Sequence, residues 1–399
     1  MKNFFNHIFQ EICTQNLIFK DVYICFHAHI VYSSLSFFQA LIDLGFKKEN
    51  IFILGKSYST VPEVASFLKK NDFNVLTMRL PEHWGDYERV ANLDSMILMK
   101  NLLRAVKKSR KPKIIIMDSG AVLTKAVYNT LISQNLDVVG VELTTQGTYK
   151  KYVYPVVEVA LSEAKRELES NFIAISILEA LNKRGFLKKE FTYGILGCGA
   201  IGKNLLYSFK EKGYTAVCYD TKKALIPRIF YRNIGTLLSE SDCIIGTTGI
   251  SSLKKEALDK MKDRVVLVST SSKDTEFSDF LFDIGVPFNT KAPFSDFNFE
   301  TKNKKKLIIT NGTFPINFDR IGAPNPTGDP EIMLTRGLWL AGLIQAIFTP
   351  SFVRPFNLKL KMDYQVAVVE NWLMYFSHNF SQNRQKQIKN FLKQVRRKS

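Results

Sequence analysis

Cysteine and histidine are scarce in this chain of 399 residues, which contains five of each. The cysteines form no Cys-x-x-Cys pair, and most of them lie in or beside apolar, strand-like runs. Scattered thiols of this kind are typical of small buried side chains in a reducing compartment. His27 and His29 lie close together, but no second pair of histidines or cysteines accompanies them. We therefore expect a cytoplasmic protein with neither a disulfide framework nor a metal site.

Long hydrophobic runs are also missing. The best apolar run, Leu338–Phe348, contains Gln345 and falls short of the roughly 20 residues that a membrane-spanning helix needs. Apolar residues between Phe5 and Ile12 recur at helical spacing, without the unbroken apolar core of a signal peptide. We expect a docking helix at the N-terminus and no membrane partner.

Acidic residues are outnumbered, 37 against 55 lysines and arginines, which gives a formal net charge of +18. Seven basic residues and no acid fall between Arg384 and Lys398. Nucleic-acid binding favours aromatic side chains among the basic ones, and this segment has only Phe391. We interpret the segment as a solvated basic tail and do not expect a nucleic-acid partner. An anionic partner such as RNA or a membrane surface is the alternative.

Two series of apolar, strand-like runs are present, separated by helix-like stretches. The first series comprises Val22–Phe26, Ile51–Leu54, Val75–Met78, Ile114–Met117 and Val138–Val141. The second comprises Tyr193–Leu196, Thr215–Tyr219, Cys243–Gly246, Val265–Val268 and Leu307–Thr310. Strands that alternate with helices favour parallel sheets covered on both faces. The expected fold class is therefore α/β, with two doubly wound, Rossmann-like domains.

The segments between and after the two series predict the domain boundaries. Residues 156–184 have the pattern of one long helix that ends at Gly185, and the segment 323–332 is rich in proline and glycine, as in a hinge. We expect a first domain over residues 1–185 and a second domain over residues 186–325, followed by a C-terminal segment over residues 326–399. A mostly apolar helix is expected over Ile332–Ile347.

The second series begins with a glycine motif. Gly197, Gly199 and Gly202 form Gly-x-Gly-x-x-Gly between a strand-like and a helix-like stretch, with Ala200 and Ile201 before the last glycine. The first glycine permits a tight turn, the second lets backbone N–H groups approach a pyrophosphate, and the third lets the helix pack on the strand. Asp220 ends the next strand, where a carboxylate binds the ribose hydroxyls and would repel a 2′-phosphate. The motif predicts a dinucleotide site that prefers NAD over NADP.

Several segments resemble S-adenosylhomocysteine hydrolases. They are HIVYSSLSFFQALIDLG at 29–45, IIIMDSGAVLT at 114–124, VELTTQG at 141–147, the glycine loop with TTG at 247–249, and MKDRVVLVSTSSKDTEF at 261–277. The resemblance implies a substrate domain, an NAD domain, and a return of residues 326–399 to the substrate domain. It also implies a homo-oligomer in which NAD transiently oxidises a ribose hydroxyl of a nucleoside thioether, so that the thiol leaves and water adds.

The resemblance further implies a set of site residues. Lys165 corresponds to a lysine at the reacting ribose and would accept the hydroxyl proton, while Glu169 would hold its ammonium group. His29, or His27 after a small gap, corresponds to a substrate-site histidine. The remaining positions are two acids that would orient the sugar and five residues that would contact the cofactor: Asp118, Glu142, Thr144, Thr145, Thr248, Gly249 and Asn311.

Departures from the family pattern leave the reaction open. Ser119 replaces one of two adjacent aspartates, Ala160 replaces an asparagine, and Ser272 and Asp329 replace histidines. Two groups suited to proton transfer near neutral pH are therefore absent. The alternatives are an NAD-dependent dehydrogenase of another small substrate and a catalytically silent NAD-binding regulator.

Overall fold

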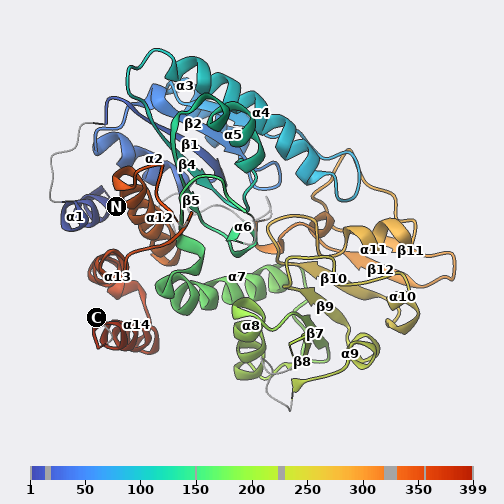
Figure 1. The fold of residues 1–399 in the computed structure, drawn as a ribbon. Helices are drawn as coiled ribbons and strands as arrows, with labels where there is room; N and C mark the ends of the chain where they lie inside the picture. Colours follow the sequence, from blue (N-terminus) through green and yellow to red (C-terminus); the bar gives the residue numbers. More distant parts are fainter. Residues whose placement is uncertain are drawn as a thin grey trace. The chain divides into compact units, whose positions relative to one another are not determined.

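Two compact units make up the chain in a computed structural model that describes residues 2–13, 19–148, 151–222, 230–318, 330–354 and 356–397. Unit 1 comprises Met1–Arg79, Ala91–Glu169 and Ala323–Ser399, and unit 2 comprises Leu80–Val90 and Ser170–Gly322. Each unit is built around one largely parallel sheet with helices packed on it, as Figure 1 shows. The expected α/β class with two doubly wound sheets is confirmed.

Unit 1 contains seven strands in the order β13-β6-β5-β4-β1-β2-β3, and each neighbouring pair is parallel. The strands are β1 (Val22–Ala28), β2 (Ile51–Gly55), β3 (Asn74–Thr77), β4 (Lys113–Asp118), β5 (Asp137–Glu142), β6 (Val156–Glu158) and β13 (Asn357–Lys359). The central strands are buried along almost their whole length, because helices cover both faces of the sheet, and this explains their continuous apolar runs.

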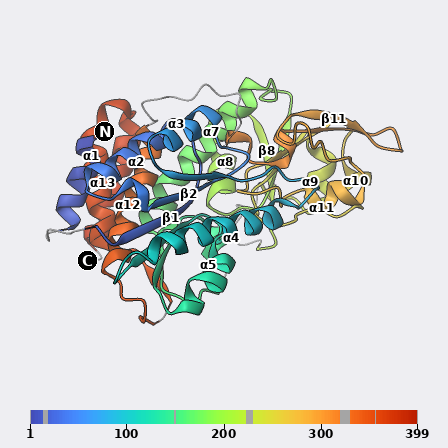
Figure 2. The ribbon, with the colours of Figure 1, turned by 90° about the horizontal axis from the view of Figure 1, so that it is seen from above.

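The helices of unit 1 follow the strands in the usual order of a doubly wound fold. They are α1 (Lys2–Ile12), α2 (Ser34–Asp43), α3 (Pro62–Lys70), α4 (Tyr87–Val106), α5 (Thr124–Thr130), α6 (Thr145–Thr148), α12 (Pro330–Phe348), α13 (Met362–Phe376) and α14 (Gln382–Arg396). In Figure 2, α2 and α3 lie on one side of β1 and β2, and α4 and α5 lie on the other. Both views place α1, α12 and α13 side by side.

Helix α12 runs through the core of unit 1, and every residue from Met333 to Ala346 is buried. Among the described residues it is the one helix long and apolar enough to cross a membrane, yet 78% of its apolar window is buried within the structure. Burial in a core explains the apolar sequence as fully as a membrane would. The mostly apolar helix expected over Ile332–Ile347 is therefore internal to unit 1 and offers no apolar surface to a second subunit, so the homo-oligomer stays a prediction.

The basic C-terminal segment forms helix α14, so the expectation of a solvated tail is wrong. Its buried residues recur at helical spacing: Arg384, Ile388, Phe391 and Val395. Nε of Arg384 donates to Glu331 Oε1 at 2.8 Å, and Nη2 donates to the carbonyl oxygen of Leu168 at 2.7 Å. The lysines of this helix are on its exposed face, so the charge pattern alone suggested a solvated tail.

The long helix expected over residues 156–184 is also wrong. The chain instead forms β6, a short 3₁₀ turn at Val159–Leu161, a π-helical turn at Lys165–Glu169, and then α7 (Ser170–Lys183). The β-branched pair that starts this segment pairs with β5 and is buried, so a strand satisfies it better than a helix. Helix α7 packs on α8 and belongs to unit 2, whereas the boundary predicted from the sequence follows it.

Unit 2 contains six strands in the order β11-β12-β10-β9-β7-β8, of which only the pair β11 and β12 is antiparallel. The strands are β7 (Thr192–Leu196), β8 (Thr215–Tyr219), β9 (Cys243–Gly246), β10 (Val265–Ser269), β11 (Phe297–Glu300) and β12 (Lys306–Ile309). Its helices are α7, α8 (Ala200–Glu211), α9 (Ile234–Glu240), α10 (Ala257–Lys260) and α11 (Ser278–Asp283). A hinge was expected at residues 323–332. Its residues 323–329 lie outside the described part of the chain, and α12 begins at Pro330.

Candidate functional site

The glycine loop lies at the point where the strand order of unit 2 reverses. The chain passes from β7 to β8 on one side of β7 and then crosses to β9 on the other side. The loops that follow β7 and β9 therefore meet at the carboxyl edge of the sheet. Ligands of open α/β sheets bind in the crevice at such a switch point.

Each glycine of the motif meets a different constraint. Gly197 has φ of +93°, and a Cβ there would lie 2.9 Å from Thr247 Oγ1. A Cβ at Gly202 would lie 2.0 Å from the carbonyl oxygen of Gly197, so a side chain would separate helix α8 from the loop. A Cβ at Gly199 would meet no atom within 4 Å. The loop is thus closed by packing at two glycines and open at the third, where α8 begins with Ala200 and Ile201.

Asp220 is held beside this loop. Its Oδ2 accepts from the backbone N–H of Cys198 at 2.7 Å, and its Oδ1 accepts from the N–H of Lys222 at 2.8 Å. The side chain is half-buried. A fixed carboxylate at the end of the second strand of the motif suits ribose hydroxyls, and the loop and Asp220 together fit a dinucleotide.

Thr248 and Gly249 lie at the same carboxyl edge of the sheet. Both donate hydrogen bonds to Glu276, an acid that was not expected from the sequence to contact them. Thr248 Oγ1 donates to Glu276 Oε2 at 2.8 Å, and the N–H of Gly249 donates to Glu276 Oε1 at 2.6 Å. Burial raises the pKa of Glu276, against the hydrogen bonds it accepts. A Cβ at Gly246 would lie 2.7 Å from this carboxylate. Glu276 therefore organises the loop after β9.

Asn311 is buried in unit 2 and uses its polar atoms internally. Its backbone N–H donates to Asp296 Oδ1 at 2.7 Å, and its Nδ2 donates to the carbonyl oxygen of Pro315 at 2.9 Å. Asp274, close by in sequence to Ser272, accepts from the N–H of Gly85 at 2.9 Å, and burial raises its pKa to about 6. Neither observation tests the predicted cofactor contact, so the contact of Asn311 with the cofactor stays a prediction.

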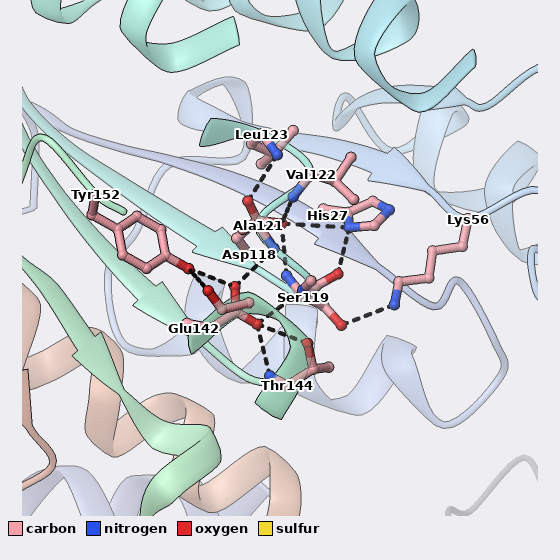
Figure 3. Close-up of polar contacts among 12 residues, drawn as sticks. His27, Lys56, Asp118, Ser119, Ala121, Val122, Leu123, Glu142, Thr144 and Tyr152 are labelled. Atoms are coloured by element: carbon pink, nitrogen blue, oxygen red, sulfur yellow. Dashed lines mark hydrogen bonds and ion pairs between the residues drawn. The ribbon is translucent and has the colours of Figure 1, made fainter. Parts of the chain in front are cut away.

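A second polar cluster lies at the switch point of unit 1, between β1 and β4 (Figure 3). His27 Nδ1 lies 3.0 Å from the carbonyl oxygen of Ser119 and 3.5 Å from Asp118 Oδ1. A carbonyl oxygen only accepts, so we assign the ring proton to Nδ1, and Nε2 of the neutral ring is then an acceptor. Burial lowers the pKa of His27 to about 4, with a further contribution from the charge of Lys56.

Asp118 and Glu142, predicted to orient a sugar, both accept hydrogen bonds from the backbone. Asp118 accepts from the N–H groups of Ser119 and Leu123 at 2.7 and 2.8 Å. Glu142 accepts from three backbone N–H groups, two of the loop after β4 and one of Thr144, and from the hydroxyl of Tyr152 at 3.1 Å. Burial and the nearby Asp118 raise the pKa of Glu142 to about 7. Both acids hold the edge of the sheet in place, as Figure 3 shows.

The other residues expected from the sequence also lie in unit 1. Lys165 pairs with Glu169 across the π-helical turn, and Glu169 also accepts from the hydroxyl of Thr335. His29 Nδ1 lies 2.7 Å from Ser59 Oγ. Thr144 donates its hydroxyl to Glu142 at 2.9 Å, and Thr145 is exposed at the start of α6. The catalytic and cofactor roles of these residues stay predictions.

Two cations that sequence analysis missed belong to unit 1. Lys56 follows β2 directly, is 1% exposed, and donates to Ser119 Oγ at 2.8 Å. Arg336 lies in the apolar helix α12 and donates to Ser33 Oγ at 2.9 Å. A lone charge within an apolar helical run was the signal that could have identified Arg336.

Metal chemistry receives no support from the part of the chain that the structure describes. In these residues no group of three histidine, cysteine or acidic side chains could hold a metal ion. All five cysteines are buried.

Comparison with known proteins gives remote relatives. No protein-family profile matches the sequence. Two uncharacterized proteins of Mycobacterium tuberculosis, from strains CDC 1551 and H37Rv, are each 26% identical over 330 residues, which cover 80% of this chain and 62% of theirs. The chain thus spans less than two thirds of the length of these relatives.

Solved structures that resemble the chain are dehydrogenases. A D-isomer-specific 2-hydroxyacid dehydrogenase from Lactobacillus delbrueckii ssp. bulgaricus in complex with NAD is 15% identical, covers 74% of this chain and 96% of its own, and has a TM-score of 0.32. An NAD-dependent formate dehydrogenase from Staphylococcus aureus, also in complex with NAD, is 13% identical, covers 74% and 94%, and has a TM-score of 0.36. At these values the likeness carries no argument about substrate or mechanism.

The resemblance to S-adenosylhomocysteine hydrolases is therefore corrected. The similar structures are dehydrogenases of hydroxy acids and formate, and the relatives in sequence are uncharacterized. The motifs that suggested the family are largely those of any doubly wound NAD-type domain, namely a glycine loop and buried strands that end in polar residues. Thioether hydrolysis and a nucleoside thioether substrate are abandoned with it.

Proposed function

We propose that this protein is an NAD-dependent oxidoreductase that acts on a small hydroxylated substrate. The observation that carries the proposal is the loop at the switch point of unit 2, which is open only at Gly199. Several of the similar solved structures are NAD complexes, which agrees with this cofactor but does not carry the proposal.

The residues of unit 2 suit the two ends of the adenosine half of NAD. Backbone N–H groups in the first turn of α8 would bind the pyrophosphate over Gly199, and the N-terminal end of the helix dipole favours that negative charge. Asp220, fixed by Cys198 and Lys222, would accept from the ribose hydroxyls. NAD, when bound, supplies the hydride acceptor for the substrate alcohol.

Binding of NAD tests the proposal. Replacing Gly199→Val fills the open space over the loop, and we expect NAD affinity to fall on the order of 100-fold, since charge-assisted hydrogen bonds from two backbone N–H groups would be lost. Glu211→Val places the same side chain at the exposed last turn of α8 and serves as the matched control. Asp220→Ala should weaken NAD more than NADP. The measurement is calorimetric titration of the purified protein with each nucleotide.

The outcome separates the proposal from its rivals. Normal NAD binding by Gly199→Val contradicts the loop assignment. NAD binding without formation of NADH from any small alcohol would favour the silent NAD-binding regulator, which retains the cofactor site but has no turnover.

A further inference from the structure

Two cations are buried at the carboxyl edge of β1 and β2 in unit 1. Lys56 follows β2, and Arg336 lies on α12, with exposed fractions of 1% and 8%. Both charges act on His29, whose pKa is lowered first by burial and then by Lys56, with Arg336 adding to the effect. Buried cations near one another are costly unless an anion compensates them.

The acids of this edge have other partners. Asp118 and Glu142 accept from backbone N–H groups of the loops after β4 and β5. Among the described residues no carboxylate forms an ion pair with Arg336. The protein thus buries a guanidinium group and, within the described chain, does not neutralise it.

The donors of Arg336 are only partly used. Nη2 donates to Ser33 Oγ at 2.9 Å and approaches Ser34 Oγ at 3.4 Å, whereas the buried Nε has no hydrogen-bond partner. A guanidinium group presents its donors in a planar fork that matches a carboxylate or a phosphate. The start of α2 lies at Ser34, so the positive end of a helix of ten residues adds to the attraction for an anion.

His27 contributes the opposite kind of group. Its Nδ1–H donates to the carbonyl oxygen of Ser119, whose hydroxyl accepts from Lys56, so Ser119 brings the two side chains together (Figure 3). Its Nε2 is buried and has no hydrogen-bond partner. A buried acceptor of this kind needs a donor, and a hydroxyl group supplies one.

We propose that Lys56, Arg336 and His27 form a binding site for a small molecule that carries both an oxyanion, carboxylate or phosphate, and a hydroxyl group. The two cations bind the oxyanion, and the hydroxyl donates to His27 Nε2. The site rests on the proposed oxidoreductase only for a reaction that would follow binding.

The test measures binding without NAD, so that failure of the cofactor proposal leaves it unaffected. The whole chain is titrated calorimetrically with glycolate and acetate, and with glycerol 3-phosphate and inorganic phosphate. We expect the hydroxylated member of one pair to bind more tightly than its partner. Binding of glycolate identifies a carboxylate ligand, and binding of glycerol 3-phosphate identifies a phosphate.

Three variants assign the binding to these residues. Arg336→Gln can still donate to Ser33, and we expect it to lose at least about tenfold in affinity, since a hydrogen bond to a charged group is lost. Arg336→Lys retains the charge and should keep part of the affinity. His27→Asn can still donate to Ser119 and should lose the preference for the hydroxylated anion.

Lys69→Gln, at an exposed position on α3, changes the net charge equally and should bind like the wild type. Circular dichroism confirms that each variant is folded. Failure of the wild type to bind any of the four probes overturns the binding site, and so does wild-type affinity in a folded Arg336→Gln variant.

Discussion

His27 is a buried titratable group whose neutral form the structure selects. It is 1% exposed, and desolvation lowers its pKa to about 4, against an ordinary value near 6.5. The unfolded chain therefore binds a proton at a higher pH than the native protein does. The stability that this histidine contributes is complete above about pH 6.5 and is lost as the pH falls toward about 4.

We expect the wild type to lose about 3 kcal/mol from this residue over that interval, since each pKa unit corresponds to about 1.4 kcal/mol. His27→Asn keeps a donor to the carbonyl oxygen of Ser119 and cannot titrate, so its stability should fall less steeply with acid. Urea unfolding at pH 7 and at pH 4.5 measures the difference. The same comparison with His29→Asn tests the second histidine, because burial also lowers the pKa of His29. Equal slopes for wild type and His27→Asn would exclude this account.

At single positions, the sequence revealed residues that belong to motifs and missed residues that contact one another only through the fold. Gly197, Gly199 and Asp220 were recognised because their spacing is fixed by local backbone geometry. Glu276 could not be connected with Thr248, because 28 residues separate them and only the adjacency of β9 and β10 brings them together. Arg336 was missed for the same reason, since Ser33 is 303 residues away in sequence.

Among the elements, apolar strands in the middle of each sheet were predictable, and three short strands were not. Runs such as those of β1 and β4 are apolar throughout, because they lie in the middle of a covered sheet. The strands β6, β11 and β13 have three or four residues, and β11 alternates between half-buried and exposed positions. Too few residues are present in each for a period to appear, so pairing with a neighbour decides their conformation.

Helix α14 allows a prediction at the level of the element, because its amphipathic packing replaces the solvated tail. Phe391 is 3% exposed within the core of unit 1, and Phe391→Ala should reduce the free energy of unfolding by about 3–5 kcal/mol. Lys389→Ala, two residues earlier on the exposed face, should stay within about 0.5 kcal/mol of the wild type. Chemical denaturation followed by circular dichroism compares them. A small effect of Phe391→Ala would restore the solvated tail.

For the molecule as a whole, each unit has a hydrophobic core of its own. The largest cluster of unit 1 joins α1, α2, α12 and α13 to its sheet, whereas two clusters lie on β7–β10 and their helices in unit 2. The alternation of strands and helices revealed both sheets, and the glycine motif indicated which of them carries the candidate dinucleotide site. The return of the C-terminal segment to unit 1 could be expected only through a resemblance, because nothing local in α12 indicates the sheet on which it packs.

Separate cores predict that NAD stabilises the two units unequally. A ligand at 100 times its dissociation constant stabilises the state that binds it by about 2.7 kcal/mol. If NAD binds the loop of unit 2, amides of β7 and β9 should exchange with solvent about 100-fold more slowly when they open by local unfolding, while those of β1 and β4 change much less. Hydrogen exchange with and without NAD, read by mass spectrometry on peptides from both sheets, measures this. Gly199→Val, whose NAD affinity should be about 100-fold lower, is the control, and at the same NAD concentration its peptides should show at most about twofold protection. Equal protection of both sheets in the wild type would mean that the two units unfold together. Amides that exchange only through one common unfolding reaction are all protected by the free energy of ligand binding.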